Sequence, residues 1–241
     1  MVPEHAVLSA TVNASSPLHP YYPLGVVIPS YVTNSLSTPA LLAIFATGCA
    51  AILLPTYLLI QTKRPGVSNT ETAIALWFIL CGFIHFFFEG YFAYNAHHLG
   101  SLGHIFAQLW KEYSLSDSRY LTQDSFVVCM ETITAIFWGP LSFLCAYCVV
   151  ADHPLRHWLQ TVVSLGQLYG DVLYFATCSF DQLVAELVHC RPELAYFWCY
   201  YVLMNAFWIV IPLALLVQSG RETTRAFALV QAMKRSGKKN L

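Results

Sequence analysis

The chain has 241 residues, of which 57% are hydrophobic and only 10% are charged, and its formal net charge is −1. An average soluble domain carries about 25% charged residues, so this composition excludes an ordinary soluble surface and indicates that lipid is the solvent for much of the chain. A net charge so close to zero gives no support for a nucleic-acid partner.

Five apolar runs are long enough to cross a bilayer as α-helices, each of which needs about 20 residues. In chain order they are residues 39–60, 72–95, 125–150, 158–178 and 196–218. The sequence therefore predicts an all-α, polytopic membrane protein with a five-helix transmembrane domain over 39–218. A lumenal N-terminal segment, 1–38, precedes it, and a basic tail, 219–241, follows it.

The linker between the second and third spans, residues 96–124, is long and of mixed character. It places Trp110, Tyr113 and Tyr120 among charged side chains. Aromatic residues interspersed with charges are typical of the membrane–water interface. We therefore expect an interfacial helix or a lid rather than a structureless loop.

Positive charge is concentrated at one end of the predicted bundle. The basic residues at this end are Lys63, Arg64, Arg156, Arg221, Arg225, Lys234, Arg235, Lys238 and Lys239. The opposite end receives Lys111, Arg119 and Arg191. Because cytoplasmic loops carry the excess of lysine and arginine, the C-terminus is predicted to be cytoplasmic and the N-terminus lumenal.

The chain ends Lys238-Lys239-Asn240-Leu241, which matches the dilysine retrieval signal of endoplasmic-reticulum membrane proteins. Such signals are read by receptors on the cytoplasmic side, which agrees with the predicted orientation. The expected location is the endoplasmic-reticulum membrane, with the nuclear envelope left open. The alternative interpretation is a merely basic tail.

Cysteine and histidine patterns give no support for a metal or a cofactor. Most of the cysteines lie in apolar runs, and only the pair Cys178 and Cys190 flanks a single loop, so their pairing is left open. The histidines are divided between the two membrane sides, with His153 and His157 on one and a cluster at 97–104 on the other. No nucleotide-binding motif is present, and we expect neither a metal nor a cofactor.

Polar side chains converge on one layer inside the predicted bundle. At 1.5 Å per residue they fall roughly 9–18 Å below the lumenal boundary. The residues of this layer are His85, Glu89, Glu131, Thr134, Asp171, Asn205 and Trp208. Ionisable groups at such depth are costly and indicate a functional site.

Interhelical hydrogen bonding without function is the alternative for this layer. It applies above all to Asp171, because Gly166 and Gly170 beside it form a GxxxG pattern that is typical of close helix packing. Trp208 lies one turn from Asn205, and an indole face can stabilise a cation.

Several ordered stretches carry a resemblance to a known family. They are Cys81–His85 with Glu89-Gly90, Leu109–Tyr113 with Asp117–Tyr120, Cys129–Thr134 with Trp138-Gly139-Pro140, Gly166–Phe175, and Met204–Trp208. From about Pro17 to about Pro212 the chain resembles the emopamil-binding protein family of sterol Δ8–Δ7 isomerases, which is of the EXPERA type. The resemblance implies a five-helix bundle with an intramembrane cavity that opens sideways to lipid.

The resemblance also implies an activity and a site. The expected reaction is an intramolecular isomerisation of cholesterol synthesis that moves the C8–C9 double bond of a sterol to C7–C8, by protonation at C9 and deprotonation at C7 through a carbocation. The expected catalytic residues are His85 and Glu89 as a proton relay and Glu131 as the counter-charge to the cation. The expected substrate-binding residues include Thr134, Asn205 and Trp208, which match the functional set of the family. Three further residues are expected to bind substrate and lie outside that matched set: Asp171 of the polar layer, and Tyr113 and Trp110 of the linker.

The expected partners are a sterol substrate, cationic amphiphilic ligands that imitate the carbocation, and the lipid bilayer. A homodimer and contacts with other sterol-synthesis enzymes are left open. Two alternatives remain for the function. One is a non-catalytic sterol- or drug-binding membrane protein of the sigma-2 receptor type, and the other is a small transporter, although no repeat symmetry supports the latter.

Overall fold

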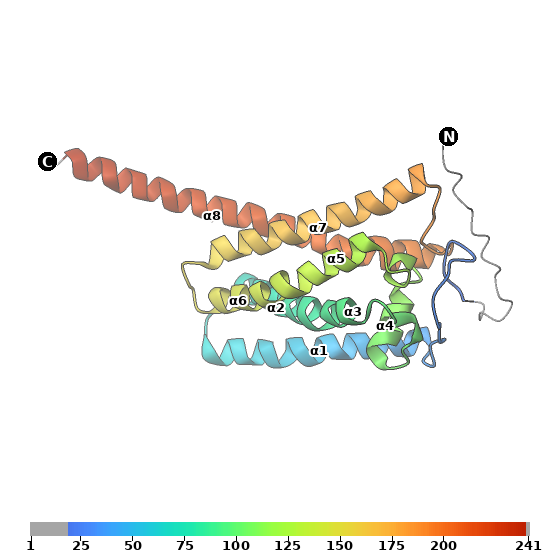
Figure 1. Cartoon of the computed structure of the whole chain (residues 1–241). Coiled ribbons are helices and arrows are strands. Elements are labelled where there is room, and N and C mark those ends of the chain that lie inside the picture. The colour runs from blue at the N-terminus through green and yellow to red at the C-terminus, as the bar shows by residue number, and fades with distance from the viewer. Residues whose placement is uncertain (1–18, 240–241) are drawn as a thin grey trace, which may run out of the picture.

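A computed structural model of the chain describes residues 19–239, with side chains described as far as residue 236. Within these residues the protein is all helical and contains no β-strand (Figure 1). Four helices are long and apolar enough to cross a membrane, and they span Thr38–Lys63, Asn69–Asn95, Ser125–Val150 and Tyr196–Ser236. The protein is therefore a helical, multi-pass membrane protein, as the composition predicts.

The first long helix, α1 (Thr38–Lys63), is continuous. A second long helix, α7 (Arg156–Val184), contains no π-helical segment, whereas the three other long helices each contain one. The first of these three composite helices consists of α2 (Asn69–Phe83), η1 (Ile84–Glu89) and α3 (Gly90–Asn95). The second consists of α5 (Ser125–Ile133), η4 (Thr134–Trp138) and α6 (Gly139–Val150), and the third of η5 (Tyr196–Met204) and α8 (Asn205–Lys239). π-Helical turns are uncommon and frequently occur at functional sites.

The observed helices extend beyond some of the predicted spans. The fourth, α7, has 29 residues, and α8 has 35 and passes through Ser219 without a break where the basic tail was predicted to begin. Figure 1 shows α8 running past the other helices at one end of the bundle. The side chains of Lys238 and Lys239 and the last two residues lie outside the described part of the chain, as do residues 1–18.

The helices pack around two buried apolar clusters. One, toward the end of the bundle from which α8 projects, includes Phe78, Cys145 and Val163 and joins α2, α6 and α7. The other lies toward the opposite end from the α8 projection and is rich in aromatic residues, among them Phe92 and Trp110. The cavity described below is lined in part by the aromatic cluster, including Trp110.

Residues 96–124 fold over one end of the bundle and are called the cap. The cap contains η2 (Leu99–Ser101), α4 (Ile105–Tyr113) and η3 (Ser118–Tyr120). Its Lys111 is fully buried, and the ammonium group donates to the carbonyl oxygens of Val32 and Leu102 at 2.6 and 2.7 Å. Tyr21 Oη donates to the Lys111 carbonyl at 3.0 Å, so the chain before α1 is fastened to the cap.

A buried ion pair holds the cap together and ties it to α7. Arg119 Nη2 lies 2.7 Å from Asp117 Oδ2, and neither side chain is appreciably exposed. Although burial acts to lower the pKa of Arg119, its hydrogen bonds to Asp117 and the charge of Asp117 raise that pKa above its ordinary value. Arg119 Nη1 also donates to Thr177 Oγ1 at 2.9 Å, and Nη2 donates to the Tyr174 carbonyl at 3.3 Å.

The loop after α7 contains no disulfide. Cys178 and Cys190, whose pairing the sequence left open, are both free thiols. This loop is held to the cap by hydrogen bonds, since Ser118 N donates to the His189 carbonyl and Arg191 N donates to the Leu115 carbonyl.

Gly139, the first residue of α6, lies against the backbone of the π-helical segment η1. A Cβ atom at this position would lie 2.9 Å from Phe86 N and 3.0 Å from Phe86 Cα, and the backbone of η1 cannot move aside as a flexible side chain could. We expect Gly139→Ala to destabilise the protein by about 1–3 kcal/mol through overpacking.

Gly48→Ala in α1 is the matched control for that variant, because a Cβ there meets nothing within 4 Å. Alanine has the higher helix propensity by about 1 kcal/mol, so this control is expected to be neutral or stabilising. Thermal unfolding in one detergent compares the two. Equal shifts in Tm would contradict the close approach of η1 and α6.

Candidate functional site

A cavity of about 410 Å³ lies inside the bundle, and its walls are mainly apolar. This volume falls within the range of about 300–1,000 Å³ that is usual for small-molecule sites. Side chains from α1, the cap, η1, the α5–η4 junction, α7, η5 and α8 line it. All nine residues predicted from the sequence are on its wall: Trp110, Tyr113, His85, Glu89, Glu131, Thr134, Asp171, Asn205 and Trp208.

His85 lies at the centre of a hydrogen-bond network in the π-helical segment η1. Its Nδ1 is 2.8 Å from Glu89 Oε2. Gln167 Nε2 lies 3.0 Å from His85 Nε2, and Trp208 Nε1 donates to the same nitrogen at 3.4 Å. Because an indole N–H can only donate, Nε2 acts as an acceptor. The ring proton therefore lies on Nδ1, where it is donated to Glu89.

Glu131 is the second carboxyl group of the network. It is buried at the end of α5, and Tyr120 Oη donates to its Oε1 at 2.8 Å. Glu131 lines the same cavity as Glu89 and lies close enough to interact with it electrostatically. The structure thus brings two carboxyl groups and one imidazole together from two different long helices.

The two neutral polar residues of the predicted layer make more local contacts. Asn205 Nδ2 donates to the Tyr201 carbonyl at 2.7 Å, one turn back along its own helix, and to Tyr113 Oη at 3.2 Å. Thr134 Oγ1 donates to the Met130 carbonyl at 2.9 Å. Asn205 therefore connects α8 to the cap, whereas the hydroxyl group of Thr134 is bonded to its own helix.

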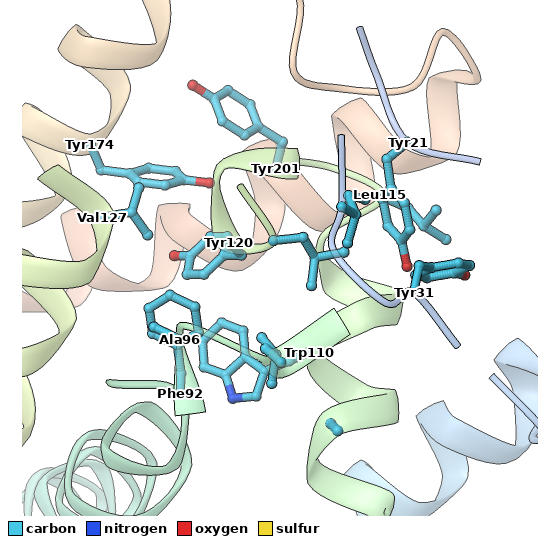
Figure 2. Close-up of a cluster of buried hydrophobic side chains, with 14 residues drawn as sticks. Tyr21, Tyr31, Phe92, Ala96, Trp110, Leu115, Tyr120, Val127, Tyr174 and Tyr201 are labelled. Carbon is cyan, nitrogen blue, oxygen red and sulfur yellow. The ribbon is translucent and has the colours of Figure 1, made fainter. Parts of the chain in front are cut away.

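The cap closes one end of the cavity with aromatic side chains. Trp110 Nε1 donates to the Phe88 carbonyl in η1 at 3.0 Å, and the two rings stack with centroids 4.6 Å apart. Figure 2 shows Tyr120 between Trp110 and Tyr174, so the residue that hydrogen bonds to Glu131 is itself held between aromatic neighbours. The cap is therefore part of the site and not only a cover.

Asp171 stands apart from this network. It lies on the cavity wall formed by α7, and its Oδ2 is buried and has no hydrogen-bond partner among the described residues. The structure places it in the predicted layer but connects it to none of the other predicted residues.

Some cavity residues escaped the sequence reasoning. Glu112 accepts hydrogen bonds from Tyr200 Oη at 3.0 Å and Thr38 Oγ1 at 3.2 Å, and it lines the cavity from the cap. Gln167 lines the cavity from α7 and contacts His85. No local sequence pattern indicates the role of either residue, because the hydrogen-bond partner of each lies more than seventy positions away in the sequence.

Comparison with known proteins places this fold and cavity in a family. The family model EXPERA (EXPanded EBP superfamily) matches residues 105–219. The chain is 41% identical over 219 residues to the 3-beta-hydroxysteroid-Delta(8),Delta(7)-isomerase of Mus musculus, covering 90% of this chain and 93% of that protein.

Two further relatives carry the same name. The Rattus norvegicus protein is 40% identical over 228 residues, covering 93% of this chain and 97% of its own length. The Cavia porcellus protein is 38% identical over 213 residues, covering 87% of this chain and 91% of its own length. With matches of this extent, the chain belongs to the EXPERA family of the 3-beta-hydroxysteroid-Delta(8),Delta(7)-isomerases.

Proposed function

We propose that this protein is a sterol Δ8–Δ7 isomerase that works inside the membrane without a cofactor. The observation that carries the proposal is the meeting of His85, Glu89 and Glu131 in a largely apolar cavity. Its relatives are named as isomerases of 3β-hydroxysteroids at these two double-bond positions. An apolar cavity with a few convergent polar groups suits a sterol, which is almost entirely hydrocarbon.

The reaction needs one proton added at C9 and one removed from C7, with a carbocation at C8 between the two steps. Two neighbouring carboxyl groups in apolar surroundings do not readily ionise together, because like charges repel each other. We infer that Glu89 and Glu131 share one transferable proton. This network would give its proton to C9 and recover one from C7, which leaves the proton count of the protein unchanged.

We assign the proton relay to Glu89 and His85 and the counter-charge to Glu131. The hydroxyl group of Tyr120 donates a hydrogen bond to Glu131, so this carboxyl group has a donor that can stabilise a negative charge on it. Glu89 would then carry the proton, and His85, whose Nδ1–H is donated to Glu89, fixes the orientation of that carboxyl group. Gln167 and Trp208 in turn hold the imidazole of His85 in one tautomer.

Two tests separate an isomerase from a sterol-binding protein without turnover. Purified protein given a Δ8 sterol and no added cofactor is expected to form the Δ7 product. In deuterated water the product should carry deuterium at C9, because the added proton comes from carboxyl groups that exchange with solvent. Binding without product would favour the non-catalytic alternative, and product without solvent label would replace the relay with a direct proton shift.

The cavity that stabilises a carbocation is also expected to bind cationic amphiphilic amines, since these imitate the charged intermediate. Trp208 lines the cavity and packs against Trp77 at 5.4 Å. Trp208→Ala should weaken the binding of a protonated amine about 10-fold more than the binding of its neutral isostere, because only the cation is attracted to the indole face. Trp208→Phe keeps an aromatic face and serves as the matched control. Equal losses for both ligands would make Trp208 a packing residue only.

We further propose that α7 also crosses the membrane, in addition to the four long apolar helices, so that five helices span it. Its polar residues, such as Gln160, Ser164 and Gln167, are buried in the bundle, while Leu165 and Val172 are exposed. An apolar exterior around a polar interior is expected of a helix that contacts lipid on one face and a functional cavity on the other. Its average hydropathy is low for this reason.

The same five-span arrangement supports the orientation and location expected from the sequence. The basic part of α8, which includes Arg221 and Arg225, projects at the end away from the cap (Figure 1). We propose that this end is cytoplasmic, that the cap is lumenal, and that the protein resides in the endoplasmic-reticulum membrane.

A further inference from the structure

Asp171 has no part in the proton transfer described above, yet it is buried on the wall of the same cavity. Its side chain belongs to a residue that is only 8% exposed, and Oδ2 has no donor among the described residues. The other cavity carboxyl groups differ, since Glu89, Glu131 and Glu112 each have a partner. An unsatisfied buried polar atom costs about 1–3 kcal/mol, so an unpaired carboxyl here calls for a ligand that donates to it.

The wall beside Asp171 leaves room for such a ligand. The two glycines of the GxxxG pattern prove to have different surroundings. A Cβ on Gly166 would lie 2.5 Å from the Trp138 ring, so Gly166 allows close helix packing. A Cβ on Gly170 would meet nothing within 4 Å, although Gly170 lines the cavity. The cavity wall next to Asp171 therefore includes bare backbone at Gly170, where no side chain fills the space.

The position of Asp171 along α7 fits the dimensions of a steroid. Gln167 fixes the register of α7, since its Nε2 lies 3.0 Å from His85 Nε2. Asp171 is four residues further along, about 6 Å by the rise of a helix. A 3β-hydroxysteroid has a hydroxyl group at C3, and its oxygen is separated from carbons C7 to C9 by about the same length, roughly one helical turn.

We propose that Asp171 binds the 3β-hydroxyl group of the sterol, which donates its hydrogen bond to Asp171 Oδ2. The inference rests on the proposed function, because it takes the reacting carbons to lie against Glu89 and His85. In a largely apolar cavity, one fixed hydrogen bond at the C3 end sets how far the ring system enters. That depth decides which carbons meet the acid and the base.

The test compares the binding of two saturated ligands, cholestanol and cholestane, which differ only in the hydroxyl group. Neither has a double bond to move, so their dissociation constants are independent of catalysis. The full-length wild-type protein in lipid nanodiscs is expected to prefer cholestanol by about 10-fold, as is usual for one hydrogen bond to a buried acceptor. Asp171→Ala should bring this ratio close to one.

Two further variants complete the experiment. Asp171→Asn keeps the volume and one acceptor oxygen, so an intermediate ratio is expected. Tyr169→Phe removes a hydroxyl group from an exposed residue of the same helix that does not line the cavity, and it should keep the wild-type ratio.

Three results would overturn the inference. They are a wild-type protein without a preference, an Asp171→Ala protein that keeps the preference, and an Asp171→Ala protein that loses both ligands equally. Turnover of a Δ8 sterol is measured in parallel. A wild-type protein that prefers cholestanol but forms no product would refute the isomerase function and leave the hydroxyl site in place.

Discussion

Replacement of Glu131 by glutamine is expected to lower the rate of sterol isomerisation by about 10²–10⁴-fold while the sterol still binds. Glutamine keeps the volume of the side chain and an oxygen that can accept from Tyr120, which donates to Glu131 at 2.8 Å. It can neither carry the counter-charge nor exchange a proton with Glu89. The loss should therefore appear in the chemical step and not in assembly of the cavity.

The matched change Glu89→Gln is expected to have an effect of the same order, because it removes the proton held beside His85. Single-turnover measurements on purified protein, with sterol binding measured separately, distinguish the chemical step from affinity. Glu222→Gln is the control, since it makes the same chemical change on the exposed part of α8 and should leave the rate unchanged. Near-normal rates in both cavity variants would remove the acid–base assignment.

The second large effect is expected in the cap, where Asp117→Asn should destabilise the protein by about 3–5 kcal/mol. Asp117 and Arg119 are both buried, and Arg119 Nε lies 3.0 Å from each carboxylate oxygen. Removing the negative charge would leave a guanidinium group buried without a counter-ion. Since Arg119 also contacts Thr177 and Tyr174, the connection between the cap and α7 should loosen with it.

A second pair of charges with the same sequence spacing supplies the control. Arg191 and Glu193 are also two residues apart and form an ion pair, but both are partly exposed. Solvent screens such a pair, so Glu193→Gln should change the Tm very little. Thermal unfolding of both variants in the same detergent makes the comparison. A small, equal shift for the two would show that the Asp117–Arg119 pair does not hold the cap.

The sequence by itself determined the membrane character, the positions of the long helices and the polar layer inside them. These features depend on composition within a window of about 20 residues, because lipid excludes charge and an apolar helix must be long enough to cross it. Charged residues such as Glu89 and Glu131 are conspicuous in such a window whatever surrounds them. The excess of lysine and arginine at one end of the bundle can also be seen from the sequence, because it depends only on the composition of the segments between the helices.

Only the tertiary structure decided how these groups meet. The π-helical segments η1, η4 and η5 each widen a helix locally, and the pattern of apolar residues did not predict them. Most of the site residues nevertheless lie in these segments or next to them. The contacts of His85 with Gln167 and Trp208 join positions 82 and 123 residues apart, which no local pattern reports. Likewise, the two glycines of the GxxxG pattern have different surroundings: Gly166 packs against Trp138, whereas nothing lies within 4 Å of a Cβ at Gly170. The sequence pattern cannot distinguish them, because the residues opposite each glycine come from other parts of the chain.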